Sequence, residues 1–249
     1  AMKYKIILSV FLFLLIGIIK PQSKFLTDKQ FEYLEIADSL LQLKQYDQNL
    51  VFVKKAYKEN PYVYHISGYL GNAYLWTDSL DQAEFYLWNE IRNNNADYGV
   101  YYDYACLQIR LGKIDSGLVY LEESFKRGVF NYEWLGKDED MDPVRNNKRY
   151  IDLMHKYFSK NDIKAIEIYY KTFDYIENGK YKKAIKNFKK AIKIENKTPI
   201  VSKALLCEVN WSMAKIYRDD LNEPSKAIEC YKSYIEHSSS FPDRKIFTA

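Results

Sequence analysis

Apolar side chains recur along the chain at the spacing of amphipathic helices, and small residues interrupt them regularly. The stretch "GYLGNAYLWTDSLDQAEFYL" (68–87) contains two apolar runs separated by a polar break, and each run carries one small residue, Gly71 or Ala83, among large ones. Two helices that pack about 8–10 Å apart need small side chains where they cross and large ones beside the crossing. The pattern therefore predicts two antiparallel helices that cross at Gly71 and Ala83.

The same pattern returns with a period of 34 residues. If successive registers start at positions 30, 64 and 98, the eighth and twentieth positions hold mostly small residues, which are Ala37, Gly71 and Ala105 at the eighth and Asn49, Ala83 and Gly117 at the twentieth. A later stretch, "GKYKKAIKNFKKAIKIEN" (179–196), repeats the second-helix pattern, and a fifth unit over 210–237 has one extra residue between its helices. The chain is therefore expected to be a repeat protein.

This arrangement resembles the tetratricopeptide repeat, a helix–turn–helix unit of 34 residues. The resemblance implies an all-α, TPR-like helical solenoid of antiparallel helix pairs, with about three repeats in residues 23–160 and about two in residues 161–249. The composition agrees, because a chain with only 9 Gly and 6 Pro among 249 residues, 47% of them hydrophobic, suits packed helices.

Residues 134–158, "WLGKDEDMDPVRNNKRYIDLMHKYF", do not fit the repeat. They resemble the end-of-group segment that closes some bacterial tetratricopeptide arrays, and such a segment would cover the apolar face of the last repeat. Within it, Asp142 and Pro143 predict the N-cap and first residue of an amphipathic helix whose apolar face includes Tyr150, Ile151, Met154 and Tyr157.

The first residues have the pattern of a secretory signal. A basic start, Met2-Lys3-Tyr4-Lys5, precedes 14 apolar or small residues, Ile6–Ile19, and a polar break follows. Residues 1–22 are therefore predicted to be a signal peptide that is cleaved near Gln22, and the alternative is an uncleaved membrane anchor. An exported protein in the periplasm or outer envelope of a bacterium is expected.

Charge and candidate chemistry narrow the function. The formal charge of +4 owes three units to the predicted signal peptide, and the rest divides into 17 basic and 21 acidic side chains in 23–160 against 17 and 12 in 161–249. The three cysteines lack metal-ligand spacing, the three histidines are far apart in sequence, and the acidic run 138–140 lacks the alternating ligands of a calcium loop. Neither a metal nor a cofactor is expected, nor is the protein expected to be an enzyme.

The resemblance also implies a binding groove lined by the first helix of each repeat. At its groove positions the chain has side chains suited to recognition of a protein or peptide, and the candidates for partner binding are His65, Asn72, Trp76, Tyr102 and Arg110. For Trp76 the alternative is simple packing against the next repeat.

A lysine stripe, Lys182, Lys186, Lys189 and Lys190, is predicted to lie opposite the apolar side of its helix. Such a stripe could contact an anionic membrane or glycan surface, or it could be only a solvated helix face; contact with nucleic acid is not expected of an exported protein. These observations together predict a non-catalytic exported scaffold for protein–protein interaction in the bacterial cell envelope. The alternatives are the extracytoplasmic sensory region of a larger signalling protein and an enzyme assembled from several repeats.

Overall fold

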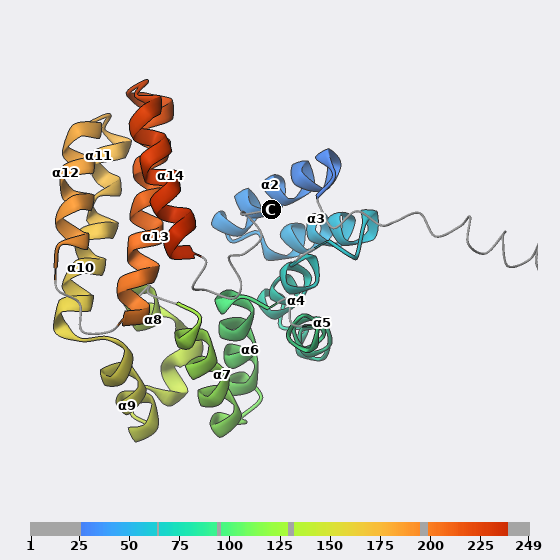
Figure 1. Cartoon of the computed structure of the whole chain (residues 1–249). Helices are drawn as coiled ribbons and strands as arrows, with labels where there is room; N and C mark the ends of the chain where they lie inside the picture. The colour runs from blue at the N-terminus through green and yellow to red at the C-terminus, as the bar shows by residue number, and fades with distance from the viewer. Residues whose placement is uncertain (1–25, 64, 94–95, 129–131, 195–198, 239–249) are drawn as a thin grey trace, which may run out of the picture. The chain divides into compact units, whose positions relative to one another are not determined.

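The computed structural model describes residues 26–63, 65–93, 96–128, 132–194 and 199–238, which form helices and no strand (Figure 1). The predicted signal peptide, residues 1–22, lies outside these ranges. None of the described helices has the length and apolar character needed to cross a membrane. The chain divides into two compact units, residues 1–89 and 90–249, and each unit is described by itself.

The first unit is built from two helix pairs. Its helices are α2 (Asp28–Gln42), α3 (Tyr46–Glu59), α4 (Ile66–Trp76) and α5 (Leu80–Arg92), of which the last residues of α5 belong to the second unit. Helix α2 begins with a capping box, in which the Thr27 side chain accepts from the backbone N–H of Gln30 and the Gln30 side chain accepts from the backbone N–H of Thr27. Gln30 is fully buried and also donates to the carbonyls of Ala56 and Asn60, so α2 is joined to the end of α3.

The second unit also contains helix pairs, and it includes residues 134–158, called here the capping segment after its predicted role. Its helices are α6 (Tyr98–Arg110), α7 (Ile114–Lys126), α8 (Tyr132–Lys137), the 3-10 helix η1 (Glu139–Val144), α9 (Lys148–Tyr157), α10 (Lys160–Lys171), α11 (Phe173–Glu177), α12 (Tyr181–Ile192), α13 (Pro199–Lys215), the π-helix η2 (Ile216–Asp220) and α14 (Pro224–Ser238). Helix α6 packs on α7, α10 on α12, and α13 on α14. The predicted fold class, an all-α TPR-like solenoid of antiparallel helix pairs, is therefore confirmed.

The turns between paired helices repeat with the predicted period. Lys44, Asp78 and Gly112 all have positive φ, and each follows the previous one by 34 residues. Gly179 occupies the equivalent turn before α12, also with positive φ. Helices often end at one residue in the left-handed conformation, which lets the chain turn back. These residues recur at the spacing that the small residues predict, so the observed turns agree with the predicted repeat register.

Small residues lie at the helix crossings. A Cβ atom added to Gly71 would come within 2.9 Å of the backbone nitrogen of Leu87 on α5, and one added to Gly117 would come within 2.6 Å of Ile109 Cγ1 on α6. Ala83 is fully buried. Asn49 is the one larger side chain in the twentieth position of the first three registers, and it is accommodated because its amide donates to the Ala37 carbonyl at 2.8 Å.

The capping segment differs from its prediction in two details. Asp142 and Pro143 lie inside η1 and do not start the amphipathic helix; α9 begins later, with Asn147 as its N-cap. Ile151, predicted to face the core, is exposed, and Leu153 is buried in its place. Pro143 is the fifth of the six residues of η1, so the Asp-Pro pair lies near the end of that helix, and the Asn147 side chain caps α9 by accepting from the backbone N–H of Arg149.

The extra residue in the fifth unit is absorbed by a π-turn. Helix α13 ends in η2, where Ile216 and Tyr217 are buried, and Asn222 then takes a positive φ before α14. A π-turn accommodates one inserted residue without ending the helix. The predicted division into two repeat arrays near residue 160 stays a prediction. The boundary at residue 89 separates two compact units, and it does not show where one array of repeats ends and the next begins.

Candidate functional site

In the first unit, helix α4 positions three of the predicted partner-binding residues. His65 is the N-cap of α4 and has positive φ, Asn72 is half-buried in the middle of the helix, and Trp76 is its last residue. The Trp76 indole stacks almost parallel on the ring of Tyr46, with centroids 5.0 Å apart and an interplanar angle of 9°. Trp76 nevertheless stays 37% exposed, so the ring is both held in place and accessible.

In the second unit, the remaining two predicted residues contact the chain itself. Tyr102 is 2% exposed, and its hydroxyl donates to Asp138 Oδ2 at 2.6 Å. Arg110 donates from Nε and Nη2 to the two carboxylate oxygens of Asp140 at 2.6 and 2.9 Å. Asp138, the N-cap of η1, and Asp140, within η1, thus occupy the face of α6 that was predicted to bind a partner. Whether these two residues also bind a partner stays a prediction.

The acidic run 138–140 makes contacts both within η1 and with α6. Asp138 caps η1, since its Oδ1 accepts from the backbone N–H of Asp140, and its other oxygen accepts from Tyr102. Burial, and to a smaller degree the nearby charge of Asp138, raises the pKa of the Tyr102 hydroxyl far above its ordinary value. Tyr102 is therefore a permanent donor to Asp138 at any physiological pH.

Cys106, Asp138 and Asp140 come together closely enough to suggest a metal site, with ligand atoms within 4.8 Å of one another. Burial, followed by the charges of Asp138 and Asp140, raises the pKa of the Cys106 thiol well above its usual value. A metal binds the thiolate, and both oxygens of Asp140 already accept from the guanidinium of Arg110. Cys106, Asp138 and Asp140 therefore suit contacts within the protein better than binding of a metal cation.

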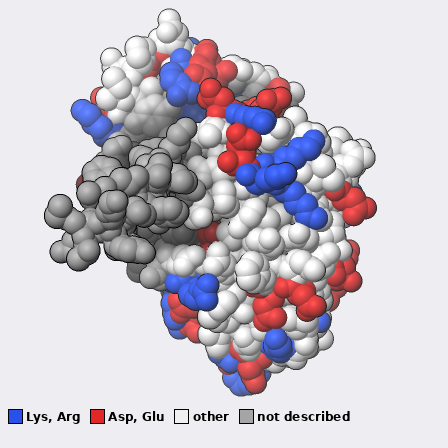
Figure 2. Space-filling view, turned by 90° about the vertical axis from the view of Figure 1, so that its right-hand side faces the viewer, with Lys and Arg blue, Asp and Glu red and all other residues white. Residues whose placement is uncertain are grey.

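The lysine stripe on α12 has the predicted geometry. Lys182, Lys186, Lys189 and Lys190 are exposed, whereas Ala184, Phe188 and Ala191 on the opposite side are buried. The face of the molecule in Figure 2 carries both Lys/Arg and Asp/Glu atoms, in several places next to each other and with uncharged areas between them. Contact of the stripe with an anionic membrane or glycan stays a prediction.

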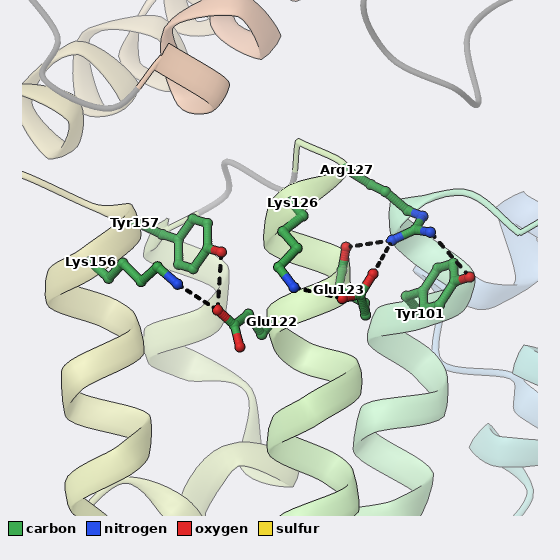
Figure 3. A network of polar contacts seen from close by, with 7 residues as sticks. All are labelled: Tyr101, Glu122, Glu123, Lys126, Arg127, Lys156 and Tyr157. Carbon is green, nitrogen blue, oxygen red and sulfur yellow. Dashed lines mark hydrogen bonds and ion pairs between the residues drawn. The ribbon is translucent and has the colours of Figure 1, made fainter.

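Sequence reasoning missed a polar network that joins α6, α7 and α9 (Figure 3). Glu122 on α7 accepts from Lys156 Nζ at 2.6 Å and from the Tyr157 hydroxyl at 3.2 Å, both on α9. Beside it, Glu123 accepts from Lys126 and Arg127, and the Arg127 guanidinium lies 3.9 Å from the centroid of the Tyr101 ring on α6.

The spacing of Glu123 to Lys126 and Arg127, three and four residues on, is visible in the sequence as a helical ion-pair pattern. The contact of Glu122 with α9 spans 34 residues and has no local signal. Hydrogen bonds from Lys156 lower the pKa of Glu122, and those from Lys126 lower the pKa of Glu123. The contacts of Glu122 therefore stabilise the packing of α9 on α7.

Comparison with known proteins supports the repeat at one place in the chain. A family model described as tetratricopeptide repeat matches residues 175–198, which include the turn at Gly179 and the whole of α12. No curated protein matches the sequence. Tetratricopeptide repeats are typically non-catalytic and generally mediate protein–protein interactions. The chain thus contains a tetratricopeptide repeat at 175–198 within an all-α fold of paired helices.

Proposed function

We propose that this protein is a non-catalytic, exported scaffold of the bacterial cell envelope that binds an extended segment of a protein partner. The binding surface is the face of α4 that carries His65, Asn72 and Trp76. The observation that carries the proposal is Trp76, whose indole is partly exposed and is held by the Tyr46 ring.

A pre-ordered aromatic side chain suits recognition for an energetic reason. Binding immobilises side chains, at a cost of about 0.5–1.5 kcal/mol for each flexible one, and a ring that is already stacked avoids most of this cost. Tryptophan is also the residue type most enriched among side chains whose truncation strongly weakens binding. Asn72, one turn earlier on the same helix, has an amide with both donor and acceptor groups, which suits the backbone of an extended segment.

The second unit supplies a supporting observation, because α6 already binds an acidic stretch of its own chain. Tyr102 and Arg110 donate three hydrogen bonds to Asp138 and Asp140, two of them from the Arg110 guanidinium to Asp140. The first helix of a repeat in this chain can therefore hold a carboxylate-bearing segment. A partner that used Tyr102 and Arg110 would have to displace this acidic stretch.

Selection from a library of extended peptides tests the binding function. The protein is expected to enrich a family of related sequences that contain an apolar residue, and to bind a representative peptide saturably with one-to-one stoichiometry in calorimetry. Enrichment of no common sequence, or binding that does not saturate, would contradict the proposal.

Export has its own test, which is independent of peptide binding. If residues 1–22 are a cleaved signal peptide, the protein isolated from its native cells begins near Ser23 or Lys24, as N-terminal peptide mapping would show. A protein that retains Ile6–Ile19 and sediments with membranes would favour the uncleaved anchor, and one that retains them in the cytoplasm would contradict export.

A further inference from the structure

The second unit contains a cleft that the binding function does not use. The cleft lies among α8, the end of η1, α9 and the start of α10, and its volume is about 490 Å³. Ligand-binding clefts for small molecules have volumes of about 300–1,000 Å³. The cleft is therefore large enough for a small molecule, although too small for a folded partner.

Most of the cleft wall is apolar. The rings of Tyr132 and Phe158 contact each other at a centroid distance of 5.5 Å, and both line the cleft together with Tyr150, Met154 and Ile163. Tyr150 and Phe158 are buried, so they form a fixed floor. Ile151 is 39% exposed and lines the cleft as well. An apolar body of a ligand would remove these surfaces from water.

The basic side chains that line the cleft are Arg145, His155 and Lys160, and the described part of the chain contributes no acidic side chain to the lining. Arg145 is already held by Asp142 Oδ1 at 2.7 Å and by the carbonyls of Leu135 and Asp138. Its charge is therefore largely balanced, whereas Lys160 and His155 are exposed at the surface of the cleft.

From this combination we infer that the cleft binds a small monocarboxylate whose body is an alkyl or aryl group. The apolar wall takes the body of the ligand, and Lys160 pairs with the carboxylate while His155 donates a hydrogen bond to it. Lys160 supplies one full positive charge, and no acidic side chain is among the lining residues that the structure describes, so the cleft matches a monoanion better than a phosphate with two charges. A neutral or cationic ligand with the same apolar body would lose this pairing.

Methionine-methyl NMR tests the inference with an internal control. Met154 lines the cleft, whereas Met213 is buried in α13 of the same unit and is not among the lining residues. Octanoate is expected to shift the Met154 methyl resonance saturably and to leave that of Met213 unchanged. Octan-1-ol and octylammonium, which have the same chain, should need about twofold to fivefold higher concentration for the same shift, because an ion pair near a surface contributes up to about fivefold in affinity.

Three variants complete the test. Lys160→Gln should weaken octanoate binding about twofold to fivefold, and Ile151→Glu, which places a negative charge on the exposed part of the wall, should abolish it while preserving the helical circular dichroism. Lys171→Gln, at an exposed position on the same helix outside the cleft, is the matched control and should bind as the wild type does. An unshifted Met154 resonance, equal affinity for the three octyl compounds, or unchanged binding by Ile151→Glu would overturn the inference.

Discussion

The substitution Gly71→Ala tests the close crossing of α4 and α5, because the sign of its effect depends on the packing. The added Cβ atom would lie 2.6 Å from Leu87 Cγ and 2.9 Å from the backbone nitrogen of Leu87, whereas ordinary contacts of a Cβ atom begin at 3.4 Å. A side chain can rotate away from such a contact, but the backbone nitrogen belongs to α5. The two helices would therefore have to separate by several tenths of an ångström.

Two opposing terms set the magnitude. Overpacking a tight interface costs about 1–3 kcal/mol. Replacing a glycine by alanine inside a helix stabilises it by about 1 kcal/mol, since the unfolded chain loses less entropy on folding. The expected net result is a decrease of up to about 2 kcal/mol in the free energy of unfolding. If Gly71 were loosely packed, only the gain from replacing glycine by alanine would remain, and the variant would be more stable than the wild type.

Urea unfolding should be followed by both tryptophan fluorescence and far-UV circular dichroism, because two compact units need not unfold together. Trp76 and Trp88 lie in the same unit as Gly71 and report on it. Gly136→Ala on α8 is the control, since a Cβ atom there would meet nothing within 4 Å, and it should stabilise the protein or leave it unchanged. A Gly71→Ala variant that is more stable than the wild type by about 1 kcal/mol, the full gain of a glycine-to-alanine replacement, would refute the crossing.

Two further predictions concern the polar contacts. The pKa values of Glu122 and Glu123 are lower in the folded than in the unfolded protein, so their stabilising contribution is complete above the ordinary glutamate pKa of 4.5 and is lost as the pH falls below it. Urea midpoints measured across this pH range should therefore fall less steeply for the Glu122→Gln and Glu123→Gln variants than for the wild type. Identical pH profiles would contradict the prediction. A double-mutant cycle of Arg110→Met and Asp140→Asn should give a coupling energy of about 1–3 kcal/mol for this half-buried, bidentate ion pair. Strictly additive changes in the free energy of unfolding would show that the pair contributes nothing to stability.

Much of the fold follows from local spacing. Small residues at helix crossings and left-handed turn residues recur with the same period because the helices of each repeat pack in the same way, as Ala83 and Gly117, 34 residues apart, illustrate. The lysine stripe of α12 was likewise predictable, because a helix with one buried side has its other side in water.

The capping segment was less predictable, since its conformation depends on contacts between distant residues. Asp138 and Asp140 are held by Tyr102 and Arg110, which lie 36 and 30 residues earlier, and no local pattern encodes such a pairing. The cleft has the same origin, because α8, α9 and α10 create it only when they pack together.

The candidate site shows the same limit. The repeat register placed Trp76 on the expected helix, yet its stacking on Tyr46 of the preceding helix was not foreseen, and packing against the next repeat was the alternative considered. The register also could not reveal that Tyr102 and Arg110 bind the chain's own acidic stretch.

The most direct test of the proposed scaffold compares two tryptophans of one repeat in their effect on peptide binding. Trp76 on α4 and Trp88 on α5 have similar exposure, 37% and 42%, so their replacement by alanine removes similar accessible surface. For a peptide selected by the wild-type protein, Trp76→Ala should weaken binding by about 2 kcal/mol or more in calorimetry, roughly thirtyfold in Kd. Trp88→Ala should leave the Kd within about twofold, with both variants retaining their helical circular dichroism. Equal losses for the two variants, or unchanged affinity for Trp76→Ala, would contradict a binding surface on α4.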